Sequence, residues 1–244
     1  MIFNDFYDYT QQVFDENTSI PPLTNGKAEK LFELTLHMLE VNKCLNLTAI
    51  KEEKAIILKH YADSLMISRY IPENSTVIDV GCGAGFPSLP LAIFRDDLKI
   101  TALDSTAKRI NYVNSTSELL DLKNLTAIAA RAEDMANNSE YRGKFDLATA
   151  RAVASLPILT ELCLPFVKIG GKFIAMKSQK ANEEISASLN AISKCGGKLD
   201  IVMEIPLISP DGISESRTII SIAKIAKTPP QFPRHFSKIS KKPL

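Results

Sequence analysis

The stretch that decides the fold reads Thr76-Val-Ile-Asp79-Val-Gly81-Cys-Gly83-Ala-Gly85-Phe86-Pro87. Its first half, Thr76–Val80, is a mostly apolar run, which is typical of a buried parallel strand. The three glycines at alternate positions let the backbone turn sharply and approach a ligand with no Cβ in the way. Pro87 and Pro90 fit the first turn of a following helix, where N–H groups have no intrahelical acceptor. The stretch therefore predicts a strand, a ligand-binding turn and a helix in succession.

Strands and helices alternate along the chain after this turn. Short runs rich in β-formers predict four further strands, at Lys99–Leu103, Leu125–Ala130, Phe145–Ala150 and Lys172–Met176. Helices are predicted at about Thr106–Leu120, Ile158–Val167 and Asn182–Lys194, and Gly170-Gly171 mark a break before the fifth strand. Such alternation indicates an α/β fold with a parallel, doubly wound sheet.

The last two predicted strands break this rhythm. Leu199–Ile205 and Thr218–Ala223 are joined by a loop that is too short for a crossover helix, so we expect an antiparallel C-terminal hairpin at one edge. Five parallel strands plus this hairpin make a mostly parallel, Rossmann-like seven-stranded sheet. That layout resembles the class I S-adenosylmethionine-dependent methyltransferases.

The chain is expected to have three regions. Apolar residues recur at helical spacing before residue 70, for example at Leu31, Leu34 and Met38, and no strand signal interrupts them. We therefore expect an N-terminal helical extension over residues 1–72 and a methyltransferase domain over 73–226. A basic C-terminal tail follows over 227–244.

The composition is that of an ordinary globular protein. The 244 residues are 45% hydrophobic and 23% charged, which allows one large core. The chain begins without a basic segment and apolar run, and no stretch approaches the roughly 18 apolar residues of a membrane span, so we expect a cytoplasmic protein with no membrane partner. The four cysteines and three histidines are scattered and predict neither disulfides nor a metal site.

Charge is distributed unevenly along the chain. The formal net charge is only +1, yet every charged residue before Pro21 is acidic and every charged residue after Glu215 is basic. A neutral protein with one basic end suits a polyanionic partner. The acidic start suggests no role.

Candidate ligand-binding residues follow the predicted strands, because ligands of open parallel sheets bind at the carboxyl ends of the strands. Asp104 ends the second strand, roughly 20 residues after the glycines, where a carboxylate can accept both hydroxyls of a ribose. Ala132 and Glu133 follow the third strand and can hold an adenine edge. Arg151 follows the fourth. Structural alternatives are a helix cap for Asp104, a helix start for Glu133 and a surface ion pair for Arg151.

The glycine spacing separates two classes of cofactor. Dinucleotide-binding turns read Gly-x-Gly-x-x-Gly and seat a pyrophosphate at a helix start. Here the third glycine comes one residue earlier, and Phe86 occupies its usual place. S-adenosylmethionine carries no phosphate, so a tighter loop and an apolar residue are acceptable. The turn therefore favours S-adenosylmethionine over a nicotinamide or flavin cofactor.

The segment after the fourth strand limits the methyl acceptor. It reads Ala150-Arg151-Ala152-Val153-Ala154-Ser155, without the Asn/Asp-Pro-Pro-aromatic segment common in methylation of exocyclic amines. It also lacks the nucleophilic cysteine that cytosine C5 methylation needs, and Cys163 is expected in the core. An acceptor that is already nucleophilic, such as guanine N7, needs no base to remove a proton.

Several segments together resemble one family, the RsmG (GidB) methyltransferases. They are the Asp79–Pro87 stretch, Asn46-Leu47-Thr48, His60-Tyr-Ala-Asp63-Ser64-Leu65, Ala150-Arg151-Ala152 and Thr228-Pro-Pro-Gln-Phe232-Pro233-Arg234. The resemblance covers nearly the whole chain. It implies an enzyme that transfers a methyl group from S-adenosylmethionine to N7 of a guanine in a loop of 16S ribosomal RNA. Cys82 departs from the small polar residue, often threonine, that is usual there.

The resemblance also implies site residues. It assigns Gly81, Phe86, Ala132, Glu133 and Arg151 to the cofactor, and the strand-end argument adds Gly83, Gly85 and Asp104. We expect no catalytic acid or base, because in-line transfer to N7 depends mainly on orientation. His60 and Asp63, three residues apart on a helix, either shape the pocket or tie the helical region to the sheet.

Basic residues late in the chain are the candidates for RNA contacts. Lys177, Arg217, Arg234 and Lys238 would hold phosphates, although a solvated charge is an equal alternative for any tail lysine. The expected partner is 16S ribosomal RNA or the small ribosomal subunit, and the expected enzyme is a monomer. Two rival functions stay open: a small-molecule methyltransferase, and a noncatalytic RNA-binding protein that keeps the fold.

Overall fold

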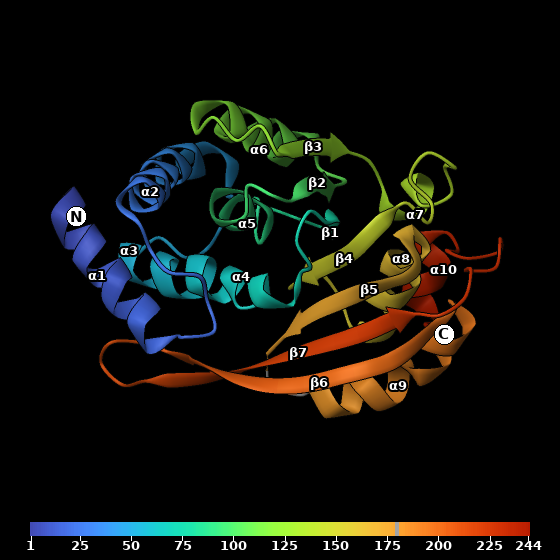
Figure 1. Ribbon diagram of the computed structural model, residues 1–244. Coiled ribbons are helices and arrows are strands. Elements are labelled where there is room, and N and C mark those ends of the chain that lie inside the picture. Colours follow the sequence, from blue (N-terminus) through green and yellow to red (C-terminus); the bar gives the residue numbers. More distant parts are fainter. Residues whose placement is uncertain (179–180) are drawn as a thin grey trace.

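A seven-stranded sheet runs through the computed structural model, which describes residues 1–178 and 181–244 (Figure 1). The strand order is β3-β2-β1-β4-β5-β7-β6. The strands are β1 (Thr76–Val80), β2 (Lys99–Asp104), β3 (Leu125–Ala129), β4 (Phe145–Arg151), β5 (Val167–Lys177), β6 (Gly197–Ile208) and β7 (Ser214–Lys224). The first five strands are parallel, and β7 lies antiparallel between β5 and β6. The predicted doubly wound sheet with an antiparallel hairpin at one edge is confirmed.

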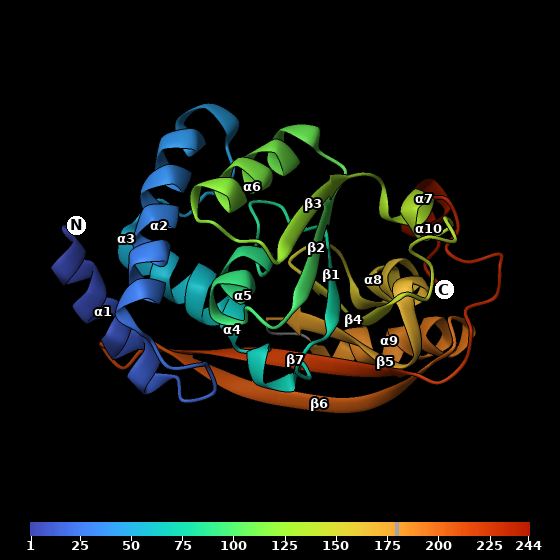
Figure 2. The same cartoon turned by 45° about the horizontal axis from the view of Figure 1, so that its top comes forward.

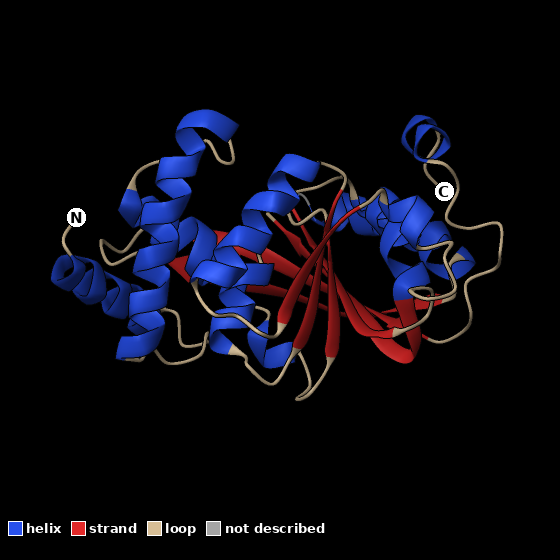
Figure 3. Cartoon of the chain, turned by 90° about the horizontal axis from the view of Figure 1, so that it is seen from above, coloured by secondary structure: helices blue, strands red, loops and turns tan. Residues whose placement is uncertain are grey.

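Helices cover both faces of the sheet (Figure 2, Figure 3). They are α1 (Phe3–Glu16), α2 (Asn25–Leu45), α3 (Glu53–Ile56), α4 (Asp63–Leu65), α5 (Ser88–Phe94), α6 (Ala107–Leu119), α7 (Ala132–Met135), α8 (Leu156–Cys163), α9 (Ala181–Lys194) and α10 (Phe236–Lys241). Successive strand residues point to opposite faces. The sheet accordingly has a hydrophobic core on each face. Val77 belongs to the core that contains the helices up to α6, and Ile78 belongs to the core that contains α7, α8 and α10.

The helices before β1 share a hydrophobic core with the sheet. Phe6, Leu34 and Tyr61 are fully buried in the same cluster as Val77. The helical pattern predicted around residues 56–66 is present as α3, a π-helical segment η1 (Ile57–Ala62) and α4. π-Helical turns are rare and frequently occur at functional sites. This segment therefore positions residues against the sheet.

The predicted break at Gly170-Gly171 is wrong, because both glycines lie inside β5. The register of β4 and β5 shifts between Phe145 and Leu147, and a Cβ on Gly171 would lie 2.4 Å from Asp146 O. Glycine in a strand commonly marks such a bulge or close backbone approach. The preceding helix accordingly ends at Cys163, and a 3₁₀ turn, η3 (Leu164–Phe166), leads directly into the strand.

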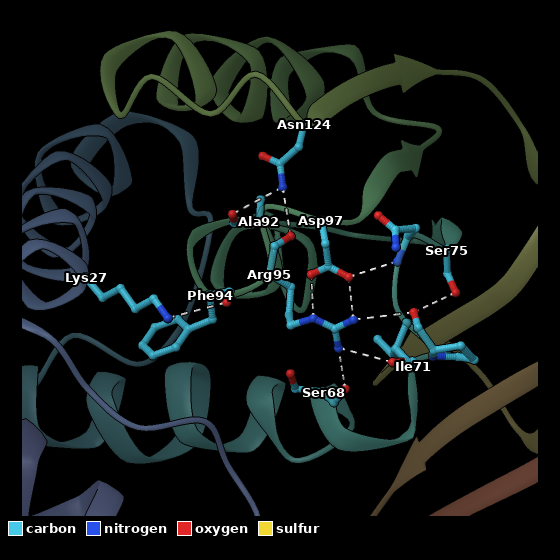
Figure 4. A network of polar contacts seen from close by, with 11 residues as sticks. Lys27, Ser68, Ile71, Ser75, Ala92, Phe94, Arg95, Asp97 and Asn124 are labelled. Atoms are coloured by element: carbon cyan, nitrogen blue, oxygen red, sulfur yellow. Dashed lines mark hydrogen bonds and ion pairs between the residues drawn. The ribbon is translucent and has the colours of Figure 1, made fainter.

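Arg95 ties the helical region to the edge of the sheet (Figure 4). Its guanidinium donates to both carboxylate oxygens of Asp97, at 2.7 Å each, and to the carbonyl oxygens of Ser68 and Ile71. Asn124, just before β3, donates to the carbonyl oxygen of Arg95 at 3.0 Å. These bonds join the chain before β1 to the turns before β2 and β3. The carbonyl oxygens of Ser68 and Arg95 also accept from the backbone N–H groups of Ile71 and Leu98, so these bonds add to the local turns.

The basic C-terminal segment folds back onto the sheet domain. Ile239 of α10 is fully buried in the core that contains α8. Arg142 donates hydrogen bonds to the carbonyl oxygens of Thr228, Pro229 and Phe232. This segment is therefore part of the folded structure.

Candidate active site

The glycine turn after β1 holds all three glycines in left-handed backbone conformations. Gly81, Gly83 and Gly85 have φ angles of 81°, 57° and 85°, which residues with a Cβ rarely adopt. The N–H groups of Gly81 and Cys82 both donate to Leu103 O, at 2.7 and 3.0 Å. The turn is thereby fixed to the end of β2.

The three glycines differ in the space beside them. A Cβ on Gly81 would lie 2.6 Å from a methyl group of Val153, and a Cβ on Gly85 would lie 2.4 Å from Leu89. A Cβ on Gly83 would meet no atom within 4 Å. Gly81 and Gly85 therefore permit close packing, whereas Gly83 keeps its open side for a ligand.

A cavity of about 470 Å³ opens beside this turn, at the carboxyl ends of β1 to β4. Its size lies within the range of about 300 to 1,000 Å³ that is usual for small-molecule sites. Seven of the eight residues predicted for the cofactor line it: Gly81, Gly83, Phe86, Asp104, Ala132, Glu133 and Arg151. Gly85 does not line the cavity, and its N–H donates to Cys82 O within the turn.

Asp104 joins the glycine turn to the start of α6. One carboxylate oxygen, Oδ2, accepts from Gly83 N–H at 3.1 Å, and the other accepts from Thr106 N–H at 2.8 Å. Arg109 Nη1 lies 3.7 Å from Oδ2. The predicted structural alternative, a helix cap at Asp104, is wrong: the N-cap of α6 is Thr106, and Asp104 bonds to the N–H of that residue in the turn before the helix. A carboxylate offers about four acceptor sites, so capacity for ligand hydroxyl groups is left.

Glu133 meets the C-terminal segment at the rim of this cavity. It is buried in α7, and its Oε1 accepts from Phe236 N–H at 3.3 Å. Phe236 itself lines the cavity together with Ala132. The start of α10 therefore forms one wall of the first cavity.

Arg151, the last residue of β4, lies between the helical region and the cavity. Its Nη1 donates to Lys59 O and to Asp63 Oδ2, each at 2.9 Å, and its guanidinium lies 5.4 Å from the centre of the Phe86 ring. The predicted alternative was an ion pair on the surface. An ion pair with Asp63 is present, but both side chains are only 12% exposed.

His60 stacks on Phe86 with ring centres 4.4 Å apart and an angle of 9° between the planes. Arg151 Nη2 lies 3.3 Å from His60 Nδ1. Because an arginine only donates, Nδ1 accepts, and the proton lies on Nε2, which is 2.9 Å from Thr48 Oγ1. Burial, aided by the charge of Arg151, lowers the pKa of His60 to about 3. A neutral His60 with both nitrogens engaged is suited to positioning Arg151 and Phe86.

A second cavity, of about 330 Å³, lies beside the first at the ends of β4, β5 and β7. Lys177 and Arg217, two of the predicted RNA contacts, line it together with Asp63. Lys177 Nζ lies 2.8 Å from Glu184 Oε2, and Arg217 Nε lies 3.0 Å from Asp63 Oδ1. Both cations are thus held in ion pairs inside a cavity.

The other two predicted RNA contacts belong to the C-terminal segment. Arg234 forms a bidentate ion pair with Glu161, whose side chain is completely buried. Lys238 is exposed on α10. The four predicted residues therefore fall into two groups. Lys177 and Arg217 line the second cavity, and Arg234 and Lys238 belong to the segment that forms one wall of the first cavity.

Three site residues escaped the sequence argument. Thr48 lies in a segment that the family resemblance singled out, so a signal was present. The sequence held no such signal for Phe236 or Glu184, because each reaches a cavity only when a distant segment of the chain packs there. Charge, spacing and periodicity do not report such docking.

Several features expected of other protein classes are absent from residues 1–178 and 181–244. No cluster of His, Cys, Asp and Glu there could hold a metal ion, and no helix has the length and hydropathy of a membrane span. Burial raises the pKa of the Cys82 and Cys163 thiols well above the usual value. Neither thiol is therefore activated as a nucleophile.

The seven-stranded sheet and the cavity beside the glycine turn are those expected of a class I S-adenosylmethionine-dependent methyltransferase. The chain belongs to the GidB family, described as rRNA small subunit methyltransferase G, whose model matches residues 27–206. The predicted family resemblance is confirmed.

Curated relatives agree with this assignment, and a solved structure has a similar fold. The Ribosomal RNA small subunit methyltransferase G of Clostridium perfringens is 44% identical over 84% of this chain and 85% of its own length. That of Acetivibrio thermocellus is 44% identical over 91% of this chain and 90% of its own. The structure of M. jannaschii TYW2 in complex with AdoMet has a TM-score of 0.50 at 20% identity, and covers 63% of this chain and 70% of that chain. This last likeness concerns the fold alone.

Proposed function

We propose that this chain transfers the methyl group of S-adenosylmethionine to N7 of a guanine in 16S ribosomal RNA. The observation that carries the proposal is the cavity beside the open face of Gly83, in a chain whose curated relatives are named for the small-subunit ribosomal RNA. That family membership disfavours the small-molecule and noncatalytic alternatives.

The residues of the first cavity suit S-adenosylmethionine. Gly83 leaves room where a Cβ would stand, and Asp104 keeps acceptor capacity for the ribose hydroxyls. We assign the adenine edge to Ala132 and Glu133. Phe86 and Arg151, whose guanidinium lies over the Phe86 ring, form the side of the first cavity that faces the second cavity.

The reaction needs no proton transfer by the protein. S-adenosylmethionine supplies an electrophilic methyl group on a positively charged sulfur. The N7 lone pair forms the new bond to carbon while the carbon–sulfur bond breaks, the bonding pair stays on sulfur, and the positive charge passes to the base. The residues of the chain have to hold the two reactants in line and exclude water, which can supply much of the rate enhancement.

The side chains near the reacting region support N7 over other acceptors. His60 is engaged at both nitrogens and its pKa is lowered to about 3, so it is unsuited to removing a proton from an amine at neutral pH. The high pKa of the Cys82 thiol argues against a covalent route to a pyrimidine. Methylation of guanine N7 requires neither a base that removes a proton nor a nucleophilic cysteine.

RNA binding is assigned to the exposed lysines around Lys238 on α10, next to the wall of the first cavity. For Arg234 we favour a structural role, because its guanidinium is committed to Glu161. We further propose that the enzyme works as a monomer in the cytoplasm. The division at residues 72 and 226 stays a prediction.

Methyl transfer from tritiated S-adenosylmethionine tests the proposal. Purified protein is incubated with 16S ribosomal RNA and, separately, with small ribosomal subunits, and the RNA is digested to nucleosides. We expect label in 7-methylguanosine. Label in any other nucleoside would contradict the N7 assignment, and no label with either substrate would contradict RNA methylation.

The control for this experiment is Gly83→Arg, which fills the open side of the turn. A Cβ on Gly83 would meet no atom within 4 Å, so the arginine extends into the ligand's side of the turn, and at a φ of 57° it also strains the turn itself. We expect loss of both cofactor binding by calorimetry and methyl transfer.

A further inference from the structure

The second cavity touches the first at a single boundary. Of the described residues, Arg151 and Ala152 line both cavities, and the other lining residues belong to one or the other. Ala152 has a φ of 57°, a left-handed conformation that is unfavourable for alanine and tends to persist at functional sites. A molecule in the second cavity would therefore meet a molecule in the first at this boundary.

The walls of the second cavity carry balanced charge. Three cations line it, Arg151, Lys177 and Arg217, together with three carboxylates, Asp63, Glu184 and Glu215. They are joined in ion pairs of 2.8 to 3.0 Å. A phosphate would need unpaired cations. A lining of paired donors and acceptors suits a neutral group with hydrogen-bonding edges.

The same cavity has apolar walls between these polar groups. Met66, Met176 and Ile219 line it and are themselves buried in the core. Thioether and aliphatic groups pack well against the face of an aromatic ring. Apolar walls with polar groups between them are what a planar heterocycle requires, because its faces are apolar and its edges polar.

We propose that the second cavity binds the acceptor guanine, flipped out of the RNA, and that Glu184 reads its N1–H and N2–H edge. This inference rests on the proposed function and adds the site of the base. Enzymes that modify a base commonly take it out of its stack and read its Watson–Crick edge in a pocket. N7 then faces the first cavity across Arg151 and Ala152.

Arg151 can serve the edge of the guanine that carries N7. O6 lies beside N7 on the same edge and is an acceptor. Within the described part of the chain, Arg151 makes three hydrogen bonds, to Lys59 O, Asp63 and His60. A guanidinium has five N–H groups, so two are left for O6, while the N7 lone pair stays free to react.

Glu184 is the carboxylate best placed to accept from the opposite edge. Both oxygens of Asp63 are held by arginines, and both oxygens of Glu215 are held by Lys59 and Arg217. Glu184 uses Oε2 for Lys177 and for Leu156 N–H, and its Oε1 accepts from none of the described residues. Oε1 is therefore available to N1–H and N2–H.

This contact would also assist the reaction. As N7 acquires the methyl group, the ring becomes positively charged and its N1–H and N2–H become stronger donors. Their bonds to a carboxylate are then stronger in the transition state than with the bound substrate, which is the condition for an increase in kcat. Glu184 thus determines base specificity and stabilises the developing charge.

The test compares guanine with inosine, whose base lacks the N2 amino group but keeps N7 and O6. The methylated guanine is first mapped, and RNA with inosine at that position is prepared by ligation. For the wild type we expect kcat/KM about 10- to 100-fold lower on the inosine RNA, as for loss of a paired base contact. For Glu184→Gln we expect low activity on both RNAs and a ratio near one. The neighbouring exposed residue supplies a matched control, Glu183→Gln, which should keep the wild-type ratio.

A second variant keeps the test decisive if Glu184→Gln folds poorly. Ser178 is exposed and lines the second cavity alone. Ser178→Trp should fill that cavity, reduce methyl transfer more than 10-fold and leave the Kd for S-adenosylmethionine unchanged. Transfer by the wild type without discrimination, or full activity of Ser178→Trp, would overturn this inference alone. No transfer by the wild type would overturn the proposed function together with it.

Discussion

Asp79 is a carboxylate buried beneath the glycine turn. Its Oδ2 accepts from the hydroxyl and the N–H of Ser88, at 2.5 and 3.3 Å. Its Oδ1 is buried and has no hydrogen-bond partner among the described residues. Burial raises its pKa to about 6, although the bonds from Ser88 oppose this shift. The fold therefore holds a charge at neutral pH in a place that disfavours it.

Replacement of this carboxylate should change how stability depends on pH. The pKa of the folded state lies above the ordinary 3.8, so the folded protein binds the proton more tightly than the unfolded chain does. The free energy of unfolding then falls as pH rises from about 4 to about 6 and levels off above. We expect Asp79→Asn to remove this fall, so that the variant gains up to about 3 kcal/mol relative to the wild type over that interval.

Urea unfolding of both proteins at several pH values between 4 and 8 measures this difference. The other carboxylates contribute equally to the two proteins and cancel. Parallel stability curves would show that Asp79 titrates as in the unfolded chain.

Single residues differ in how far sequence could predict their place. Gly83 and Asp104 were both placed at the carboxyl edge of the sheet by the rule for parallel strands, and they are hydrogen-bonded there. His60 and Asp63 were left between two roles. Their contacts with Arg151 cross about 90 residues of chain and depend on how a helical region packs. No local pattern encodes that packing.

At the scale of elements, an ion pair anchors the basic segment that connects β7 to α10. Arg234 donates to both oxygens of Glu161 in α8, and its N–H donates to Oε1 as well, at 2.9 Å. The Glu161 side chain is 0% exposed. Without this partner a buried charge would remain unpaired, which is costly. The ion pair therefore anchors the segment that carries Phe236 to the first cavity.

Arg234→Ala should accordingly destabilise the protein as a whole. We expect the free energy of unfolding to fall by about 3 kcal/mol, which is typical for removal of one partner from a buried pair. Thermal and urea unfolding measure the loss. Lys238→Ala, on an exposed position of the same segment, should change stability by less than about 0.5 kcal/mol. Equal stability of the two variants would argue for a surface role of Arg234.

Elements were predicted best where periodicity and sheet rules act together. β1 was predicted to the residue, and the antiparallel hairpin followed from a short loop. The break at Gly170-Gly171 was wrong because a strand absorbs both glycines in a bulge. The same residue type marks a turn or a bulge, and the pairing of distant strands decides which.

At the scale of the whole molecule, positive charge lies on the segment beside the site. Lys238 and Lys241 are exposed on α10, whereas Lys99 and Lys123 are exposed near the amino ends of β2 and β3. Ligands bind at the opposite, carboxyl edge of such a sheet. Only the first pair is therefore expected near bound RNA.

RNA binding at several salt concentrations tests this placement. Each phosphate contact adds about 0.7 to the slope of log K against log salt for single-stranded RNA. The double variant Lys238→Ala/Lys241→Ala should lower the slope by about 1.4. The matched variant Lys99→Ala/Lys123→Ala should keep the wild-type slope. An equal change in both variants would indicate diffuse attraction without a defined face.

The wall that Phe236 forms has a consequence for the order of synthesis. Gly83 and Asp104 are translated well over a hundred residues before the segment that closes their cavity and bonds to Glu133. A nascent chain that stops short of residue 236 holds the complete glycine turn with one side of its cavity open. We therefore expect the cavity for the methyl donor to reach its final form only when translation has passed α10.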